Sequence, residues 1–137
     1  ETYRANAEAA RADLAELITQ VGAGLEPVQG KAFVVFHDAY HYFENRFGLT
    51  GAGALLKSDA SAPSAARLRE IEHIMQERGV VCVFSEPQFN DKIIRTIAGD
   101  AKIAELDPIG VTQEAGPGLY GAVLGTLGDA FIQCLGE

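Results

Sequence analysis

The stretch that decides the fold is "KAFVVFHDAYHYFENRFG", residues 31–48, in which a short apolar run passes directly into a more polar one. Residues 31–36 are almost wholly apolar and rich in Val and Phe, which is typical of a strand buried on both faces of a parallel sheet. Residues 38–47 then have helical spacing. A strand followed at once by a helix is the repeating unit of α/β domains.

The same alternation continues along the rest of the chain. Further strands are indicated at 80–85 and 102–106, with a weaker candidate at 53–57. Helical patterns lie between and after them, at about 63–78 (opening at Pro63), 90–98 and 118–135. The sequence therefore predicts one α/β domain of right-handed βαβ units, with a parallel four-stranded sheet flanked by helices on both faces.

Residues 2–25 read as one long helix that precedes the first strand. Arg, Glu and Asp occupy one side, and the other carries an apolar stripe formed by Tyr3, Ala7, Ala10, Leu14, Leu17, Val21 and Leu25. Such a stripe suits a helix laid against a sheet or joining two lobes, and Gly30 ends the connection to the first strand.

Composition and charge exclude several classes of protein. The 137 residues suit one domain, 47% of them are hydrophobic, and no apolar stretch approaches the ~20 residues that span a bilayer, so no membrane-spanning segment is expected. A net charge of -8 has the wrong sign for nucleic acid or an anionic membrane surface and suits cationic partners. Because Glu1 opens the chain without a secretion-signal pattern, we expect a trimmed or partial product.

Polar residues stand where three of the predicted strands end. His37, Glu86 and Asp107 each follow a strand, and ligands bind outside the carboxyl ends of parallel strands. An imidazole with carboxylates is a donor set that Zn²⁺ accepts, as do manganese and iron at other ratios. The alternative is that Glu86 and Asp107 cap the turns at Pro87 and Pro108.

The other histidines carry weaker signals. His41 follows His37 by four residues, but His37 stands at the strand–helix junction, so the pair need not share a helix face. Asp38 takes the place of the Glu in a zinc-protease motif, and we expect it to favour the positive N-terminus of the 38–47 helix. His73 shares its helix face with glutamates and is expected at the solvated surface.

Neither a Gly-rich phosphate loop nor a G-x-S-x-G nucleophile motif follows any strand. Gly121, Gly125 and Gly128 in the last helix are expected to permit close helix packing. The two cysteines, Cys82 and Cys134, are too few for a structural zinc site and are either a disulfide or two buried thiols. A bridge between them would add about 4 kcal/mol of stability in an oxidising compartment.

The stretches "VFHDAYHYFENRFGLT", "CVFSEPQF", "LDPIG" and "QCLGE" together resemble the C-terminal lobe of ZnuA-type zinc receptors, from about Ala5 to Glu137. These are the substrate-binding proteins of bacterial high-affinity zinc ABC importers. The resemblance implies two α/β lobes joined by a long rigid helix, with metal bound between them. Residues 1–29 would then be the end of the linking helix and its connection, and residues 30–137 the C-terminal metal-binding lobe.

The resemblance also implies roles for single residues. His37 matches the metal-binding histidine of this lobe, and Asp107 matches the carboxylate of its "LDP" stretch. Manganese-type relatives usually carry a carboxylate where His37 stands, so the imidazole favours zinc. Glu86 is expected to orient His37. Cys82 and Cys134 match a disulfide of related receptors, which implies the periplasm.

Zn²⁺ would be the transported ligand, with an ABC permease and the N-terminal lobe as partners. Because that lobe holds the remaining histidine ligands, this chain would carry half a site, with micromolar affinity or weaker. The resemblance implies a binding protein and not an enzyme. Two alternatives stay open: a manganese or iron receptor of the same family, and a zinc-dependent hydrolase, for which the chain offers few ligands.

Overall fold

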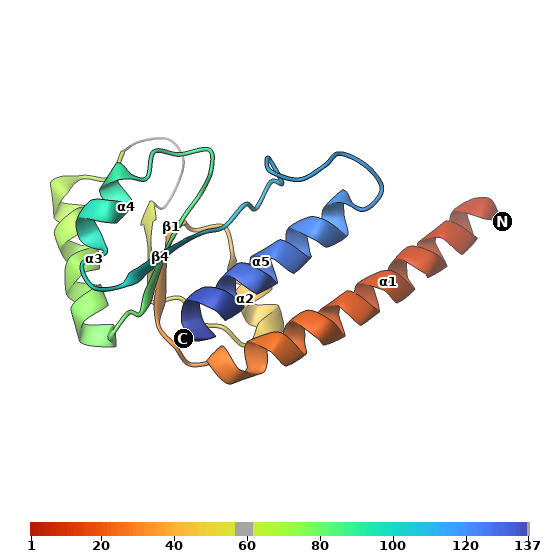
Figure 1. The fold of residues 1–137 in the computed structure, drawn as a ribbon, viewed down its shortest axis with the longest axis horizontal. Helices are drawn as coiled ribbons and strands as arrows, with labels where there is room; N and C mark the ends of the chain where they lie inside the picture. The colour runs from red at the N-terminus through yellow and green to blue at the C-terminus, as the bar shows by residue number, and fades with distance from the viewer. Residues whose placement is uncertain (57–61, 137) are drawn as a thin grey trace.

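Four short parallel strands form the sheet in the computed structural model, which describes residues 1–56 and 62–136 (Figure 1). Their order across the sheet is β2-β1-β3-β4. The strands are β1 (Phe33–His37), β2 (Gly53–Leu56), β3 (Cys82–Ser85) and β4 (Lys102–Glu105). The parallel four-stranded sheet is therefore confirmed, including the weaker candidate at 53–57, whose Lys57 lies outside the described residues.

Helices cover both faces of the sheet because alternate residues of a strand point to opposite sides. Val34 and Phe36 of β1 pack with α3 (Ala65–Arg78) and α4 (Lys92–Ile97). Phe33 and Val35 lie in a second core on the other face. This core is built with α1 (Thr2–Leu25), the short 3-10 helix η1 (Glu26–Val28), α2 (His41–Phe47) and α5 (Leu119–Gly136).

Two expectations differ from the structure in detail. The helix expected over 38–47 begins only at His41, because residues 38–40 make a turn after β1. Burial on both faces holds for β1 but not for β4, which lies at the edge of the sheet and leaves Ile103 39% exposed. An edge strand has one neighbour, so an apolar run alone does not reveal how deeply a strand is buried.

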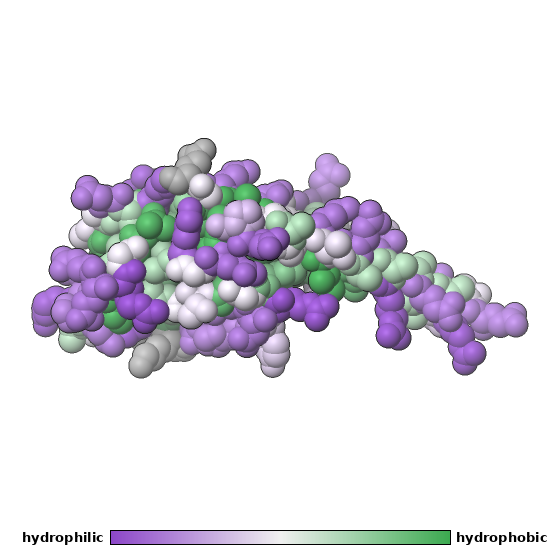
Figure 2. Space-filling model, turned by 90° about the horizontal axis from the view of Figure 1, so that it is seen from below, coloured by the Kyte–Doolittle hydropathy of each residue, from purple (hydrophilic) through white to green (hydrophobic). Residues whose placement is uncertain are grey.

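Helix α1 extends as predicted over 24 residues, but much of its length projects from the body (Figure 1). Of its apolar stripe, Val21 and Leu25 are buried and Leu17 packs against the core. Tyr3, near the projecting end, is 91% exposed. From below, hydrophilic and weakly hydrophobic side chains are mixed along this projection, with more strongly hydrophobic surface near its base (Figure 2). The N-terminal part of the stripe is thus without a covering layer in the described part of the chain.

Helix α5 is long and apolar enough, by length and composition, to cross a membrane. In the structure its apolar side lies in the core, where Val123, Leu127 and Phe131 are buried. Its C-terminal end is fixed by a disulfide between Cys134 and Cys82 at the start of β3, across 52 residues of sequence. The core thus uses part of the apolar surface of α5, and the pairing of Cys82 with Cys134 is confirmed.

Close packing between α1 and α5 depends on one glycine of the three expected to permit it. A Cβ atom on Gly128 would lie 2.9 Å from Cγ1 of Val21, a branched and buried side chain. A Cβ on Gly125 would make only an ordinary contact with Leu17, and one on Gly121 would meet no described atom within 4 Å. The expectation is therefore right for Gly128 and wrong for Gly121.

We expect Gly128→Ala to destabilise the protein by about 1–3 kcal/mol, because overpacking outweighs the gain in helix propensity. Gly121→Ala is the matched control and should be neutral or stabilise by up to about 1 kcal/mol. Denaturant unfolding of both variants measures the difference. Equal effects of the two substitutions would show that the α1–α5 contact is not tight at Gly128.

Candidate metal site

The sheet brings His37 and Glu86 together at the carboxyl ends of neighbouring strands. His37 is the last residue of β1, and Glu86 directly follows β3. Phe33 is aligned with Cys82 and Val34 with Val83, and the same register carried forward places His37 beside Glu86. Both residues point to the face of the sheet that carries α5, because they alternate in phase with Phe33 and Cys82. The expected convergence of strand ends is therefore present for this pair.

A buried carboxylate lies at the centre of the site. The Glu86 side chain is fully buried, and its Oε1 lies 2.5 Å from Nδ1 of His37. The Tyr40 hydroxyl donates a hydrogen bond of 2.8 Å to the same Oε1. Gln88 Nε2 donates to the other oxygen, Oε2, at 2.9 Å. We call these four residues the Glu86 cluster. Hydrogen bonds to both oxygens offset the cost of burying the charge of Glu86.

Aromatic rings fix the position of the His37 ring within the cluster. Phe89 meets it edge to face with ring centroids 6.0 Å apart, and Phe89 itself stacks on Phe36 at 4.7 Å. Tyr40 lies on another side, with its ring centroid 6.2 Å from that of His37. Burial raises the pKa of the Tyr40 hydroxyl far above its ordinary value, and the charge and hydrogen bond of Glu86 raise it further. Tyr40 is therefore a neutral donor at all physiological pH values.

Asp107, two residues beyond β4, organises the loop that follows it. Its Oδ1 accepts from the backbone N–H of Val111 at 3.0 Å. Its Oδ2 accepts from the backbone N–H of Thr112 at 2.8 Å and from the Thr112 hydroxyl at 2.7 Å. Burial tends to raise the pKa of Asp107, but these hydrogen bonds outweigh it and the pKa is lowered. Asp107 therefore caps the turn that follows it, which was the alternative to metal binding, and the hydrogen bonds of this cap favour the ionised carboxylate.

The structure does not bring the three expected residues into one closed metal site. Within residues 1–56 and 62–136, no group of three His, Cys, Asp or Glu side chains is arranged to hold a metal ion. His37 and Glu86 are in contact, while Asp107 is near enough to act electrostatically on Tyr40. His37 and Asp107 therefore stand at the same edge of the sheet as one imidazole and one separate carboxylate.

His41 does not pair with His37. Its Nε2 lies 3.0 Å from Asp38 Oδ1 and its Nδ1 lies 3.3 Å from Glu44 Oε2, on a ring that is 67% exposed. The charge of Asp38, followed by the interactions with Glu44, raises the pKa of His41. Asp38 was expected at the N-terminus of the helix, but because the helix begins at His41, Asp38 forms an ion pair with that residue instead.

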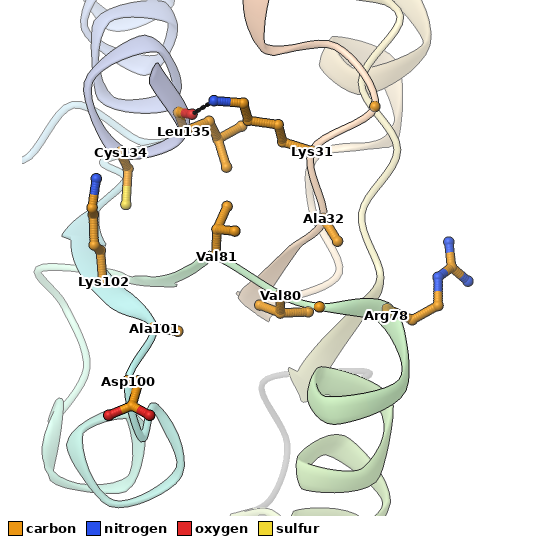
Figure 3. A pocket seen from close by; sticks show the side chains of 12 residues that line it. Lys31, Ala32, Arg78, Val80, Val81, Asp100, Ala101, Lys102, Cys134 and Leu135 are labelled. Atoms are coloured by element: carbon orange, nitrogen blue, oxygen red, sulfur yellow. Dashed lines mark hydrogen bonds between the residues drawn. The ribbon is translucent and has the colours of Figure 1, made fainter. Parts of the chain in front are cut away.

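His73 is exposed and pairs with Glu77 one turn along α3, at 3.2 Å, as expected for a surface residue. A hollow of about 560 Å³ lies at the other end of the strands, near the disulfide. Its basic side chains do not converge on one point: Lys31 donates to the carbonyl oxygen of Leu135, and Arg78 extends away from Lys102 (Figure 3). The Glu86 cluster is therefore the better candidate site.

Two residues of the Glu86 cluster, Tyr40 and Gln88, were not predicted from the sequence. Both are near expected site residues, since Tyr40 follows His37 by three positions and Gln88 follows Glu86 by two. Their roles depend on side-chain directions in two turns, which hydrophobic periodicity does not describe. A physical argument could have pointed to them: if Glu86 is buried, hydrogen-bond donors must reach both of its carboxylate oxygens.

The lowered pKa of Asp107 predicts an acid-sensitive contribution to stability. A folded-state pKa below the ordinary 3.8 means that the ionised group stabilises the fold above that pH, and that this stabilisation is lost as pH falls through the folded-state pKa. We expect Asp107→Asn to cost about 1–3 kcal/mol at neutral pH in metal-free buffer, and less below about pH 4.

Denaturant unfolding of the wild type and of Asp107→Asn across this pH range tests the prediction. Asp129→Asn, at an exposed position on α5, is the control. A constant difference between wild type and Asp107→Asn down to the acid range would contradict it.

A parallel sheet flanked by helices, with a half-buried imidazole on a buried carboxylate at its strand ends, defines an α/β lobe with a candidate ligand site. Residues 1–134 match the family model "Zinc-uptake complex component A periplasmic" (ZnuA), and the chain belongs to this family. It is 42% identical over 137 residues to the high-affinity zinc uptake system protein ZnuA of Brucella suis and 44% identical to that of Paracoccus denitrificans. These matches cover 98% of this chain and 41% and 42% of the two relatives.

Solved structures share the fold. The chain aligns with the crystal structure of ZnuA at a TM-score of 0.79 and 26% identity, covering 97% of this chain and 48% of that one. For the laminin-binding adhesin Lmb of Streptococcus agalactiae the TM-score is 0.85 at 27% identity, with 98% and 52% covered. The chain thus spans about two fifths of its curated relatives and about half of these structures.

Proposed function

We propose that this chain is the C-terminal lobe of a periplasmic solute-binding protein that captures Zn²⁺ and delivers it to an ABC permease. The observation that carries the proposal is the contact between the His37 ring and the buried Glu86 carboxylate. Histidines that bind metals commonly donate their second ring N–H to a carboxylate, which fixes the ring and increases its basicity. His37 then offers Nε2 to the metal.

Asp107 supplies the second donor of this half-site. Its hydrogen bonds with Gly110, Val111 and Thr112 keep it ionised and fixed in place. One imidazole and one carboxylate oxygen are acceptable zinc ligands but leave a tetrahedral shell half complete. The remaining ligands come from a second lobe, so this chain alone binds zinc with micromolar affinity or weaker.

The projecting part of α1 supports the division into a linking helix, residues 1–29, and a metal-binding lobe, residues 30–137. An apolar groove runs between α1 and the start of α5, lined by Ala10, Leu14, Leu17 and Tyr120 among others. Tyr120 and Tyr3 are both largely exposed. Large apolar side chains left open in this way are typical of surfaces that another domain covers. A helical link would keep movement between the lobes small.

The family and the disulfide together support the proposed transport role and location. The family description names zinc uptake and the periplasm, and the Cys82–Cys134 bridge suits an oxidising compartment. In this function zinc is cargo: it is bound and released unchanged, and the protein performs no catalysis. The permease is its membrane partner.

Zinc competition with a chromophoric chelator tests the proposal on this chain. We expect His37→Ala to weaken binding at least about tenfold, because it removes the imidazole ligand. His73→Ala, which removes an exposed imidazole on α3, is the matched control and should leave the affinity unchanged. Competition by Mn²⁺ on the same samples separates a zinc half-site from a manganese one.

Binding that is indifferent to His37→Ala would contradict the proposed site. Tighter binding of Mn²⁺ than of Zn²⁺ would contradict the assignment of the cargo.

A further inference from the structure

We propose that Tyr40 is a positioning residue that determines which nitrogen of His37 faces the metal. It acts through Glu86: the Tyr40 hydroxyl holds the carboxylate where it accepts the Nδ1 proton of His37, and Nε2 is left without a proton. The inference rests on the proposed function for the statement that His37 binds zinc. The tautomer itself is a property of the metal-free protein.

The direction of the hydrogen bonds follows from the chemistry of the groups. Glu86 is a carboxylate with donors on both oxygens, Tyr40 on Oε1 and Gln88 on Oε2. An ionised carboxylate can only accept hydrogen bonds. Nδ1 of His37 lies 2.5 Å from Oε1, although the pair does not meet the geometry of a hydrogen bond. Two lone pairs that close would repel each other, so this contact favours a proton on Nδ1. Its Nε2 then has a free lone pair, which a metal ion requires.

Burial makes the Tyr40 hydroxyl hard to replace. Tyr40 is 3% exposed and the Glu86 side chain is fully buried, so water has little access to the oxygen that the hydroxyl contacts. Without this donor, Oε1 loses one of the two groups that fix its position. Gln88 would hold only the other oxygen. The carboxylate could then rotate away from the imidazole, and the Nδ1–H tautomer would lose its advantage.

Tyr40 also connects two turns that the sheet alone does not join. It lies in the 38–40 turn after β1, whereas Glu86 and Gln88 lie in the turn after β3. Its hydrogen bond therefore fixes the position of one turn relative to the other at the end of the strands. Tyr42 gives a matched comparison, because it is two residues further along and is 93% exposed.

The first experiment measures the His37 tautomer without metal. The chain is labelled with ¹⁵N-histidine, and two-bond ¹H–¹⁵N spectra are recorded at about pH 8, where an ordinary histidine is neutral. We expect the Nδ1–H form for His37 in the wild type and in Tyr42→Phe, and a mixture of tautomers in Tyr40→Phe. An Nε2–H form in the wild type would overturn the inference, whether or not the variant folds. Retention of the pure Nδ1–H form in a folded Tyr40→Phe would also overturn it.

The second experiment measures the consequence for the metal by chelator competition. We expect Tyr40→Phe to weaken zinc binding about 3–10-fold, which is at or below the low end of the loss seen when a hydrogen-bond partner of a metal ligand is removed. Tyr42→Phe should leave zinc binding unchanged. A changed tautomer with unchanged zinc affinity would overturn the role of Tyr40 in metal binding. If His37→Ala leaves the zinc affinity unchanged while Tyr40→Phe changes the His37 tautomer, the proposed function fails and the positioning of His37 by Tyr40 stands.

Discussion

The burial of the Glu86 carboxylate is the constraint on which the candidate site depends. A charge enclosed by the sheet and helices is tolerated only where donors reach both of its oxygens, and here Tyr40 and Gln88 donate one hydrogen bond to each. The His37 ring lies in close contact with the same carboxylate. Satisfying that charge fixes the turn after β1 against the turn after β3. The imidazole of His37 is therefore held in a defined position and orientation, and in the proposed function this order would reduce the cost of binding a metal.

The fold was predictable wherever hydrophobic pattern and topology agree. The run at 31–36 is followed by helical spacing, and the structure has β1 and α2 there because buried parallel strands and amphipathic helices leave distinct patterns. The hydrophobic pattern did not predict features that depend on which elements lie next to each other in the fold. It did not show that β4 would be an exposed edge, or that residues 38–40 would form a turn that delays α2.

The site was predictable only in part, for a related reason. Parallel strands end at one edge, so the placement of His37 and Glu86 there follows from sequence. The sequence did not show how the two carboxylates differ: Glu86 contacts the His37 ring, whereas Asp107 accepts hydrogen bonds from its own loop. That distinction depends on turn geometry and on the donors nearby. For the same reason the sequence did not predict that Tyr40 belongs to the site, although it lies three residues from His37.

A zinc titration of the ¹⁵N-histidine-labelled chain, followed by NMR, tests most directly the claim that this sheet edge holds one half of a zinc site. The account predicts that the Nε2 resonance of His37 responds first, while the exposed rings of His41 and His73 stay unchanged at the same zinc concentration. A first response at His41 or His73, with the His37 resonances unmoved, would contradict it.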